Sequence, residues 1–118
     1  MYTISKEFTF SASHQLFGLA DDHPCARLHG HNYTVVVELQ AMELGPTGFV
    51  RDYRELNTFK TYLEEEVDHR HLNDIFGDAH VTAEGLAHRF FTWCRNLWPE
   101  VSAVRVSETP KTWAEYRP

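Results

Sequence analysis

The chain has 118 residues, and its 17 acidic and 11 basic residues give a formal net charge of −6. This length suits a single domain, residues 1–118, with a modest hydrophobic core. The acidic balance excludes the basic surface that a nucleic-acid-binding protein needs. We therefore expect no nucleic-acid partner, and an anionic ligand has to be recognised by a local pocket.

The first residues and the cysteines indicate the compartment. The N-terminal segment lacks the basic start and apolar run of a signal peptide, and no apolar stretch approaches the length of a membrane span. Cys94 belongs to an apolar helical pattern, as a small buried hydrophobe would, and Cys25 lies in a different context, so no disulfide framework is indicated. We expect a cytoplasmic protein with no membrane partner.

The first half of the chain predicts strands. Residues 2–14 alternate in part between apolar and polar side chains and predict a long strand. Residues 15–30 are rich in turn-forming residues and predict a loop. The β-branched run over 32–42 predicts a second strand, which a turn at 44–48 ends. Residues 49–52 suggest a short third strand.

The second half begins with a change of period. Apolar residues three or four apart over 53–67 predict an amphipathic helix, and 68–80 returns to loop character. A threonine cap and an apolar stripe predict a second helix over 82–98. Alternation over 101–107 and again over 111–116 predicts two closing strands.

This order of elements predicts an α+β domain, in which an antiparallel sheet of about four strands carries two helices packed on one face. Unpaired edges of such a sheet are a liability unless subunits pair them. We therefore expect the chain to form a homo-oligomer through its sheet edges.

Three histidines and a cysteine predict a metal site. In an extended segment, residues two apart point to the same face, so His29 and His31 project together, and Gly30 removes the side chain that would crowd the other side. Three imidazoles, with His14 as the third, leave one position of a zinc ion open for water or substrate, which is the catalytic pattern. Cys25 is then a reactive thiol beside the metal. Spacing alone leaves open a structural site in which Cys25 is the fourth ligand.

A carboxylate and an imidazole follow the first predicted helix. Asp68 and His69 are a candidate pair in which the carboxylate orients the imidazole for general acid/base catalysis. Neighbouring residues face one point in a loop but not on a regular strand. The alternative is an ordinary helix end, where a charged histidine interacts with the helix dipole.

Glu108 lies at the end of the penultimate strand. A carboxylate that faces a pocket there can accept two parallel hydrogen bonds from an N–H and an NH₂ group, such as the edge of a guanine or pterin ring. The alternative is a solvated surface glutamate.

Several motifs follow one another along the chain: Phe10-Ser11-Ala12-Ser13-His14, Cys25-x-x-x-His29-Gly30-His31-Asn32-Tyr33, Val67-Asp68-His69-x-x-Leu72-Asn73, Thr82-Ala83-Glu84 and Ser107-Glu108-Thr109. Together they resemble the family of 6-pyruvoyltetrahydropterin and 6-carboxytetrahydropterin synthases, from about residue 3 to the C-terminus. The three-residue gap between Cys25 and His29 resembles the bacterial 6-carboxy branch, since the animal pyruvoyl synthases carry a longer gap.

The resemblance implies a role for each candidate residue: zinc ligands His14, His29 and His31, catalytic thiol Cys25, acid/base pair Asp68 and His69, and pterin anchor Glu108. It places no role on His71, and Val81 stands where relatives often have proline. It also implies the tunnelling fold, in which subunits join their sheets into a barrel, commonly as a homohexamer of two stacked trimers with active sites between subunits.

The reaction that the resemblance implies is a lyase reaction. It converts 7,8-dihydroneopterin triphosphate into 6-carboxy-5,6,7,8-tetrahydropterin, with release of acetaldehyde and triphosphate, for 7-deazaguanine synthesis toward queuosine or other deazapurines. Two alternatives remain beside the structural zinc site. One is a 6-pyruvoyltetrahydropterin synthase, and the other is a zinc- and pterin-binding module without turnover.

Overall fold

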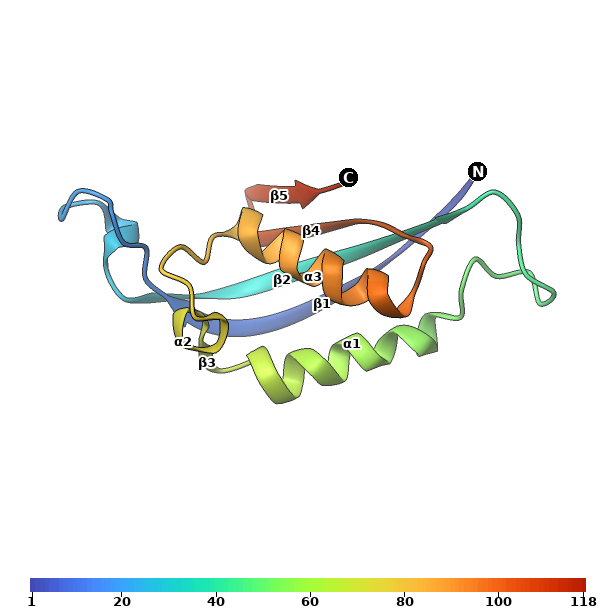
Figure 1. The fold of residues 1–118 in the computed structure, drawn as a ribbon, viewed down its shortest axis with the longest axis horizontal. Coiled ribbons are helices and arrows are strands. Elements are labelled where there is room, and N and C mark those ends of the chain that lie inside the picture. Colours follow the sequence, from blue (N-terminus) through green and yellow to red (C-terminus); the bar gives the residue numbers. More distant parts are fainter.

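In the computed structural model, which describes residues 1–118, the chain folds into one five-stranded sheet with helices on one of its faces (Figure 1). The strands are β1 (Tyr2–His14), β2 (His29–Ala41), β3 (Arg70–His71), β4 (Val101–Thr109) and β5 (Thr112–Tyr116). Their order in the sheet is β3-β1-β2-β4-β5. Neighbours are antiparallel except β3, which pairs with β1 in parallel.

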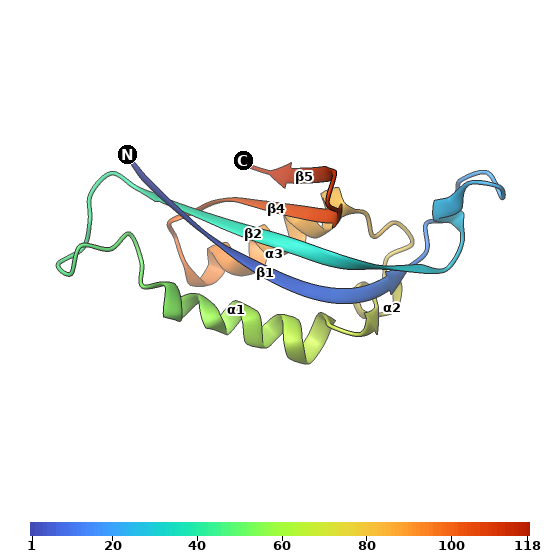
Figure 2. The ribbon, with the colours of Figure 1, turned by 180° about the vertical axis from the view of Figure 1, so that it is seen from behind.

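Three helices complete the fold: α1 (Asn57–Tyr62), α2 (Leu72–Phe76) and α3 (Ala83–Leu97). A 3-10 turn at Tyr53–Leu56 leads into α1, and a π-helical turn at Leu63–Val67 continues it. Seen from behind, the strands lie in front of α3, so one face of the sheet carries no helix (Figure 2). No helix combines the length and the apolar character of a membrane span.

The expected α+β architecture with helices on one face is confirmed, with three local differences. The sheet has five strands rather than about four. Residues 49–52 form no strand. Arg51 forms ion pairs with Glu100 and Glu55, and the side chain of Asp52 caps the following 3-10 turn. Residues 68–80 are not a plain loop, since they contain β3 and α2.

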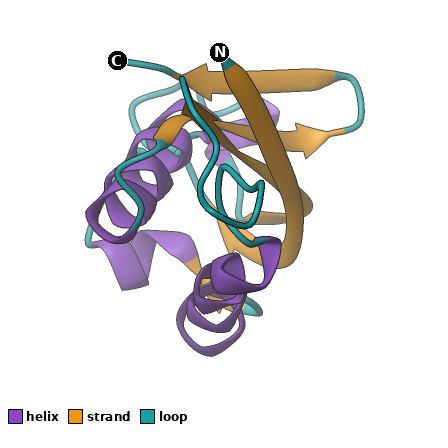
Figure 3. Cartoon of the chain, turned by 90° about the vertical axis from the view of Figure 1, so that its right-hand side faces the viewer, coloured by secondary structure: helices purple, strands orange, loops and turns teal.

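The long β1–β2 hairpin determines where the core and the site lie. Its register runs without interruption from Tyr2↔Ala41 to His14↔His29. Alternate residues of both strands are buried under α1 and α3, for example Phe8 on Phe59 with ring centroids 5.1 Å apart. The sheet twists around the helices (Figure 3), and the molecule is elongated, at 55 × 26 × 23 Å.

An ion-pair network on the helix-free face holds the last strand. Glu38 on β2 is 9% exposed and accepts hydrogen bonds from Arg117 at 2.6 and 3.1 Å and from Ser102 at 2.5 Å. The hydrogen bonds from Arg117 hold the pKa of Glu38 below its ordinary value, although burial opposes them. The network therefore joins the segment after β5 to the centre of the sheet.

Candidate metal centre and active site

The three histidines meet at one end of the sheet. His14 and His29 are directly opposite each other in the last pair of the β1–β2 ladder, and His31 is opposite Ala12. The Nε2 atoms of His14 and His29 are 2.9 Å apart, and one nitrogen from each of the three rings lies within 4.8 Å of the others. The imidazoles that the sequence grouped by spacing are therefore grouped in space.

Two backbone carbonyls orient the rings. The carbonyl oxygen of Val81 is 2.6 Å from Nδ1 of His14, and that of Arg27 is 2.7 Å from Nδ1 of His29. Because a carbonyl only accepts, each Nδ1 carries the ring proton, and each Nε2 of the neutral rings presents a lone pair. Two lone pairs that face each other repel unless a cation lies between them, so the donor set fits a metal ion.

His31 adds the third nitrogen. Its Nε2 is buried without a hydrogen-bond partner, 3.6 Å from Oε2 of Glu108. Burial lowers the pKa of His31, although Glu108 opposes the shift. The lowered pKa favours the neutral ring, which is the form that ligates metals.

Cys25 lies near the cluster in the chain but outside it in space. It occupies a 3-10 turn, Pro24–Ala26, in the loop that extends beyond the end of the sheet (Figure 1). The group of metal-ligating atoms consists of three imidazoles and does not include the Cys25 sulfur. The geometry favours an open three-histidine arrangement over the four-ligand structural site.

Asp68 and His69 form the contact that was predicted for a loop. Oδ2 of Asp68 is 2.8 Å from Nδ1 of His69, and Oδ1 accepts a hydrogen bond of 2.8 Å from the backbone N–H of Ser11. His69 has φ of 60°, in the left-handed region, which allows neighbouring side chains to meet. The Ser11 N–H, with a further contribution from His69, lowers the pKa of Asp68. The carboxylate is therefore charged and anchored to the edge of β1.

A shallow hollow of about 610 Å³ includes His69 and part of His31 in its lining, although the His31 ring points to the other face of the sheet, with Ala12 and the histidine cluster. Ser11 and Ser13, which also line it, alternate along β1 with the core residues, so the hollow lies on the helix-free face. His71 is a further lining residue. Cys25 lies in neither the histidine cluster nor this hollow, so one chain does not bring the whole predicted site together.

Glu108 faces the metal cluster from β4. Its side chain is 25% exposed, and it lines a second hollow, of about 310 Å³, with Glu84 and Trp113. It is therefore neither a fully solvated glutamate nor a buried one. A carboxylate that is partly open and beside the cluster is available to a ligand.

Tyr33 is a site residue that the sequence reasoning missed. Its hydroxyl is buried without a hydrogen-bond partner, and its ring lies 5.5 Å from that of His31. Burial, with Glu108 adding to it, raises the pKa of Tyr33. The sequence could have indicated this residue, because Tyr33 follows His31 by two positions and therefore lies on the same face of the strand.

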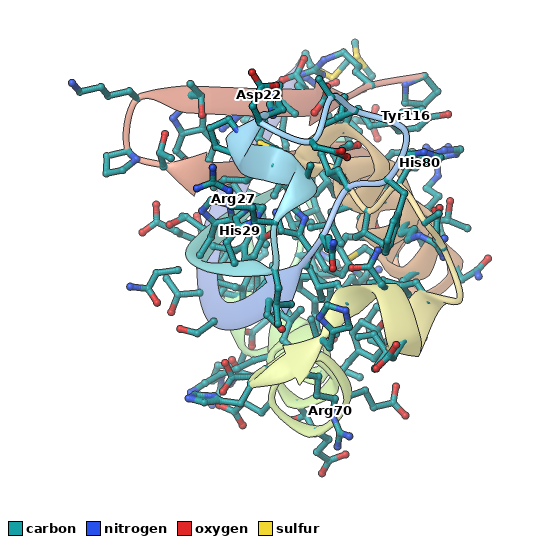
Figure 4. The ribbon with its side chains drawn as sticks, turned by 90° about the vertical axis from the view of Figure 1, so that its left-hand side faces the viewer. Asp22, Arg27, His29, Arg70, His80 and Tyr116 are labelled. Carbon is teal, nitrogen blue, oxygen red and sulfur yellow. The ribbon has the colours of Figure 1, made fainter.

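The carbonyl oxygens of Arg27 and Val81 were also missed, and no signal could have found them. Their contribution is a backbone atom, which leaves no mark on residue type. Figure 4 views this end of the molecule, with Arg27 beside His29 and with Arg70 at the bottom, beyond β3.

Comparisons with known proteins identify one family. The family model described as 6-pyruvoyl tetrahydropterin synthase matches residues 3–118. A 6-carboxy-5,6,7,8-tetrahydropterin synthase of Synechocystis is 33% identical, over 98% of this chain and 93% of its own length. The human 6-pyruvoyl tetrahydrobiopterin synthase is 31% identical, over 97% and 90%.

A solved structure gives the same result for the fold. The 6-pyruvoyl tetrahydropterin synthase of Caenorhabditis elegans superposes with a TM-score of 0.86 at 29% identity, over 99% of this chain and 95% of that one. The subunit fold that the resemblance implied is confirmed by this likeness. The chain belongs to the 6-pyruvoyl tetrahydropterin synthase family.

Proposed function

We propose that the chain is a zinc-dependent 6-carboxytetrahydropterin synthase. It would convert 7,8-dihydroneopterin triphosphate and water into 6-carboxy-5,6,7,8-tetrahydropterin, acetaldehyde and triphosphate. The observation that carries the proposal is the cluster of His14, His29 and His31, in which two carbonyl-anchored rings direct their lone pairs at each other and a third nitrogen is buried without a partner. The 6-carboxy assignment follows the Synechocystis relative and the Cys25–His29 spacing.

The three imidazoles would hold the zinc ion. When bound, it supplies a Lewis acid that stabilises negative charge on hydroxyl oxygens of the substrate side chain. Three protein ligands leave room for those oxygens. His14 is 1% exposed, so the residue at the base of the cluster is shielded from solvent.

The proton transfers belong to Cys25 and the Asp68–His69 pair. Cys25, as the thiolate, takes a proton from a side-chain carbon of the substrate. Asp68 accepts the Nδ1 proton of His69 in a hydrogen bond, which fixes the tautomer and leaves Nε2 free to take up or return a proton. Glu108 accepts two hydrogen bonds from the N–H and NH₂ groups of the pterin ring.

These groups would be completed between copies of the chain. Asp68 and His69 lie at the β3 edge of the sheet, whereas Cys25 lies in the loop beyond its end. β3 pairs only with Ala12 and Ser13, so the outer edge of β1 has no strand partner from Tyr2 to Phe10. Pairing of such edges supports the proposed homohexamer of two stacked trimers.

The product would enter 7-deazaguanine synthesis in the cytoplasm. The deciding experiment is incubation of the zinc-loaded protein with 7,8-dihydroneopterin triphosphate, followed by assays for acetaldehyde and triphosphate. Both products are expected in equal amounts. Triphosphate without acetaldehyde would make the chain a 6-pyruvoyl synthase, the second candidate, which the human relative favours. Neither product would make it a binding module.

A further inference from the structure

Cys25 lies in a short 3-10 turn, Pro24–Ala26, which we refer to as the Cys25 turn. No residue of the turn is buried, so apolar packing does not fix it. The turn is ordered from within, because the ring of His23 accepts a hydrogen bond of 3.0 Å from the backbone N–H of Cys25, and the carbonyl oxygen of His23 accepts one of 3.0 Å from the N–H of Ala26. The position of the Cys25 thiol therefore depends on the contacts that fasten the turn to the rest of the chain.

Two hydrogen bonds fasten the Cys25 turn to the residues that follow His14. The side-chain Nε2 of Gln15 donates to the carbonyl oxygen of Ala26 at 2.8 Å, and the backbone N–H of Leu16 donates to the carbonyl oxygen of Cys25 at 2.9 Å. Gln15 comes directly after His14, a proposed zinc ligand. These two bonds therefore fix the Cys25 turn relative to the histidine cluster.

Asn73 holds the backbone of Gln15. It belongs to α2, which lies beside the end of β1 (Figures 1 and 2). Its Oδ1 accepts a hydrogen bond of 2.8 Å from the backbone N–H of Gln15, and its Nδ2 donates to the carbonyl oxygens of Gln15 at 2.8 Å and of Asp78 at 3.0 Å. Both amide N–H donors of Asn73 are therefore used, and its side chain pairs with the Gln15 backbone as a neighbouring strand would.

The same contacts join Cys25 to the segment of the acid/base pair. Asp68 and His69 directly precede β3, and α2 directly follows it. Asn73 and Gln15 therefore connect the Cys25 turn to the edge that carries Asp68 and His69. In the proposed oligomer, each copy presents its thiol and its acid/base pair on one connected frame, so a shift of the turn would misalign the thiol.

Resting on the proposed function, in which Cys25 takes a proton from the substrate, we propose that Gln15 and Asn73 are positioning residues that hold its thiol in place. A displacement of about 1 Å at a reacting group can lower the rate by about a hundredfold. Loss of either side chain should therefore reduce turnover and leave zinc binding and pterin binding in place.

The first test measures how fast iodoacetamide alkylates Cys25 in the zinc-loaded protein, with the modified residue assigned by mass spectrometry. Cys94 is buried and serves as the unreactive internal thiol. Gln15→Ala is expected to react about twofold to tenfold faster than wild type, the factor that loss of one hydrogen bond allows, and Asn73→Ala at least as fast as Gln15→Ala. Gln40→Ala is the matched control, because Gln40 lies at the far end of the same hairpin, and it should react as wild type does. Metal analysis should find equal zinc content in all of them.

Kinetics separate the positioning role from the reaction. With 7,8-dihydroneopterin triphosphate, Gln15→Ala should lower kcat by about tenfold or more and change KM little, because the thiol acts in the chemical step. Gln15→Ala keeps the backbone contacts with Asn73, so it tests the role even where Asn73→Ala fails to fold. An alkylation rate or a kcat equal to wild type in Gln15→Ala would overturn the positioning role, even if the wild-type protein makes product. Faster alkylation of Gln15→Ala without any product from the wild-type protein would support the anchoring of the Cys25 turn and overturn the proposed reaction.

Discussion

Replacing His69 by glycine and by alanine separates its chemistry from its backbone conformation. His69 is the one non-glycine residue with positive φ, at 60°. A side chain in the left-handed region costs about 1–2 kcal/mol, and alanine keeps that cost. Glycine avoids it but loses about 0.5–1 kcal/mol through the greater freedom of its unfolded chain. Both variants lose the same contact with Asp68, so that loss cancels in the comparison.

The glycine variant is therefore expected to be more stable than the alanine variant by about 0.7 kcal/mol, the middle of the range of about 0–1.5 kcal/mol that these two costs leave. For a chain of this length, that difference corresponds to a Tm higher by about 2–4 °C. Thermal unfolding at equal protein concentration measures it. Turnover should be equally low in both variants, because both lack the imidazole.

Two results would refute this reasoning. An alanine variant as stable as the glycine variant would show that the backbone at residue 69 is not strained. Turnover close to wild type in either variant would remove His69 from the acid/base pair, whatever the stability data show. Circular dichroism of both variants confirms that the fold is retained.

Four further outcomes follow from the site and the sheet. His29→Ala should lose bound zinc and activity together while the subunit still folds, and metal analysis that finds full zinc occupancy would show the ligand to be wrong. Cys25→Ala should keep zinc, and its turnover should fall by at least about a hundredfold, which is the contribution of a positioned acid or base. If single-turnover assays find that activity is retained, another group takes the proton. Glu108→Gln should weaken the binding of biopterin, measured by calorimetry, by about tenfold or more, because an NH₂ group would then face a donor of the ring. Unchanged affinity would show that Glu108 does not anchor the pterin. Glu38→Gln should destabilise the fold by about 1–3 kcal/mol at pH 7. Because the folded pKa of Glu38 is lowered by Arg117, the difference from wild type in urea unfolding should be complete above pH 4.5 and shrink as the pH falls below it. A difference independent of pH would refute the linkage.

The sequence predicted the parts of the fold that repeat. The alternation over 2–14 and 32–42 located β1 and β2 to within a few residues, because half-buried strands must alternate. The two-residue spacing of His29 and His31 placed them on one face, and the pairing of two long strands then brought His14 opposite His29. Residues 29 and 30, which were predicted as loop, belong to β2. Long periodic segments carry such information in residue type.

The parts that the sequence did not predict depend on contacts made elsewhere. β3 has two residues, too few for a period, and it is a strand only because Ser11 to Ser13 offer it an edge. The contact of His71 with Ser13 joins residues 58 positions apart and follows from that pairing. The local pattern of residues 49–52 predicted a strand, but Arg51 forms an ion pair with Glu100, a residue 49 positions away that the local pattern does not include.

The position of the histidines in the β1–β2 ladder bears on which changes in length the chain can accept. His14 and His29 form the last pair of an uninterrupted ladder, and the residues between them lie outside it. Inserting one residue into either strand would shift the register and send the following side chains to the opposite face, which would disperse the three nitrogens. Lengthening the connection over residues 15–28 would leave the ladder intact and cost little in closure entropy. The connection can therefore gain residues before Cys25 while Arg27 and the metal ligands stay where they are.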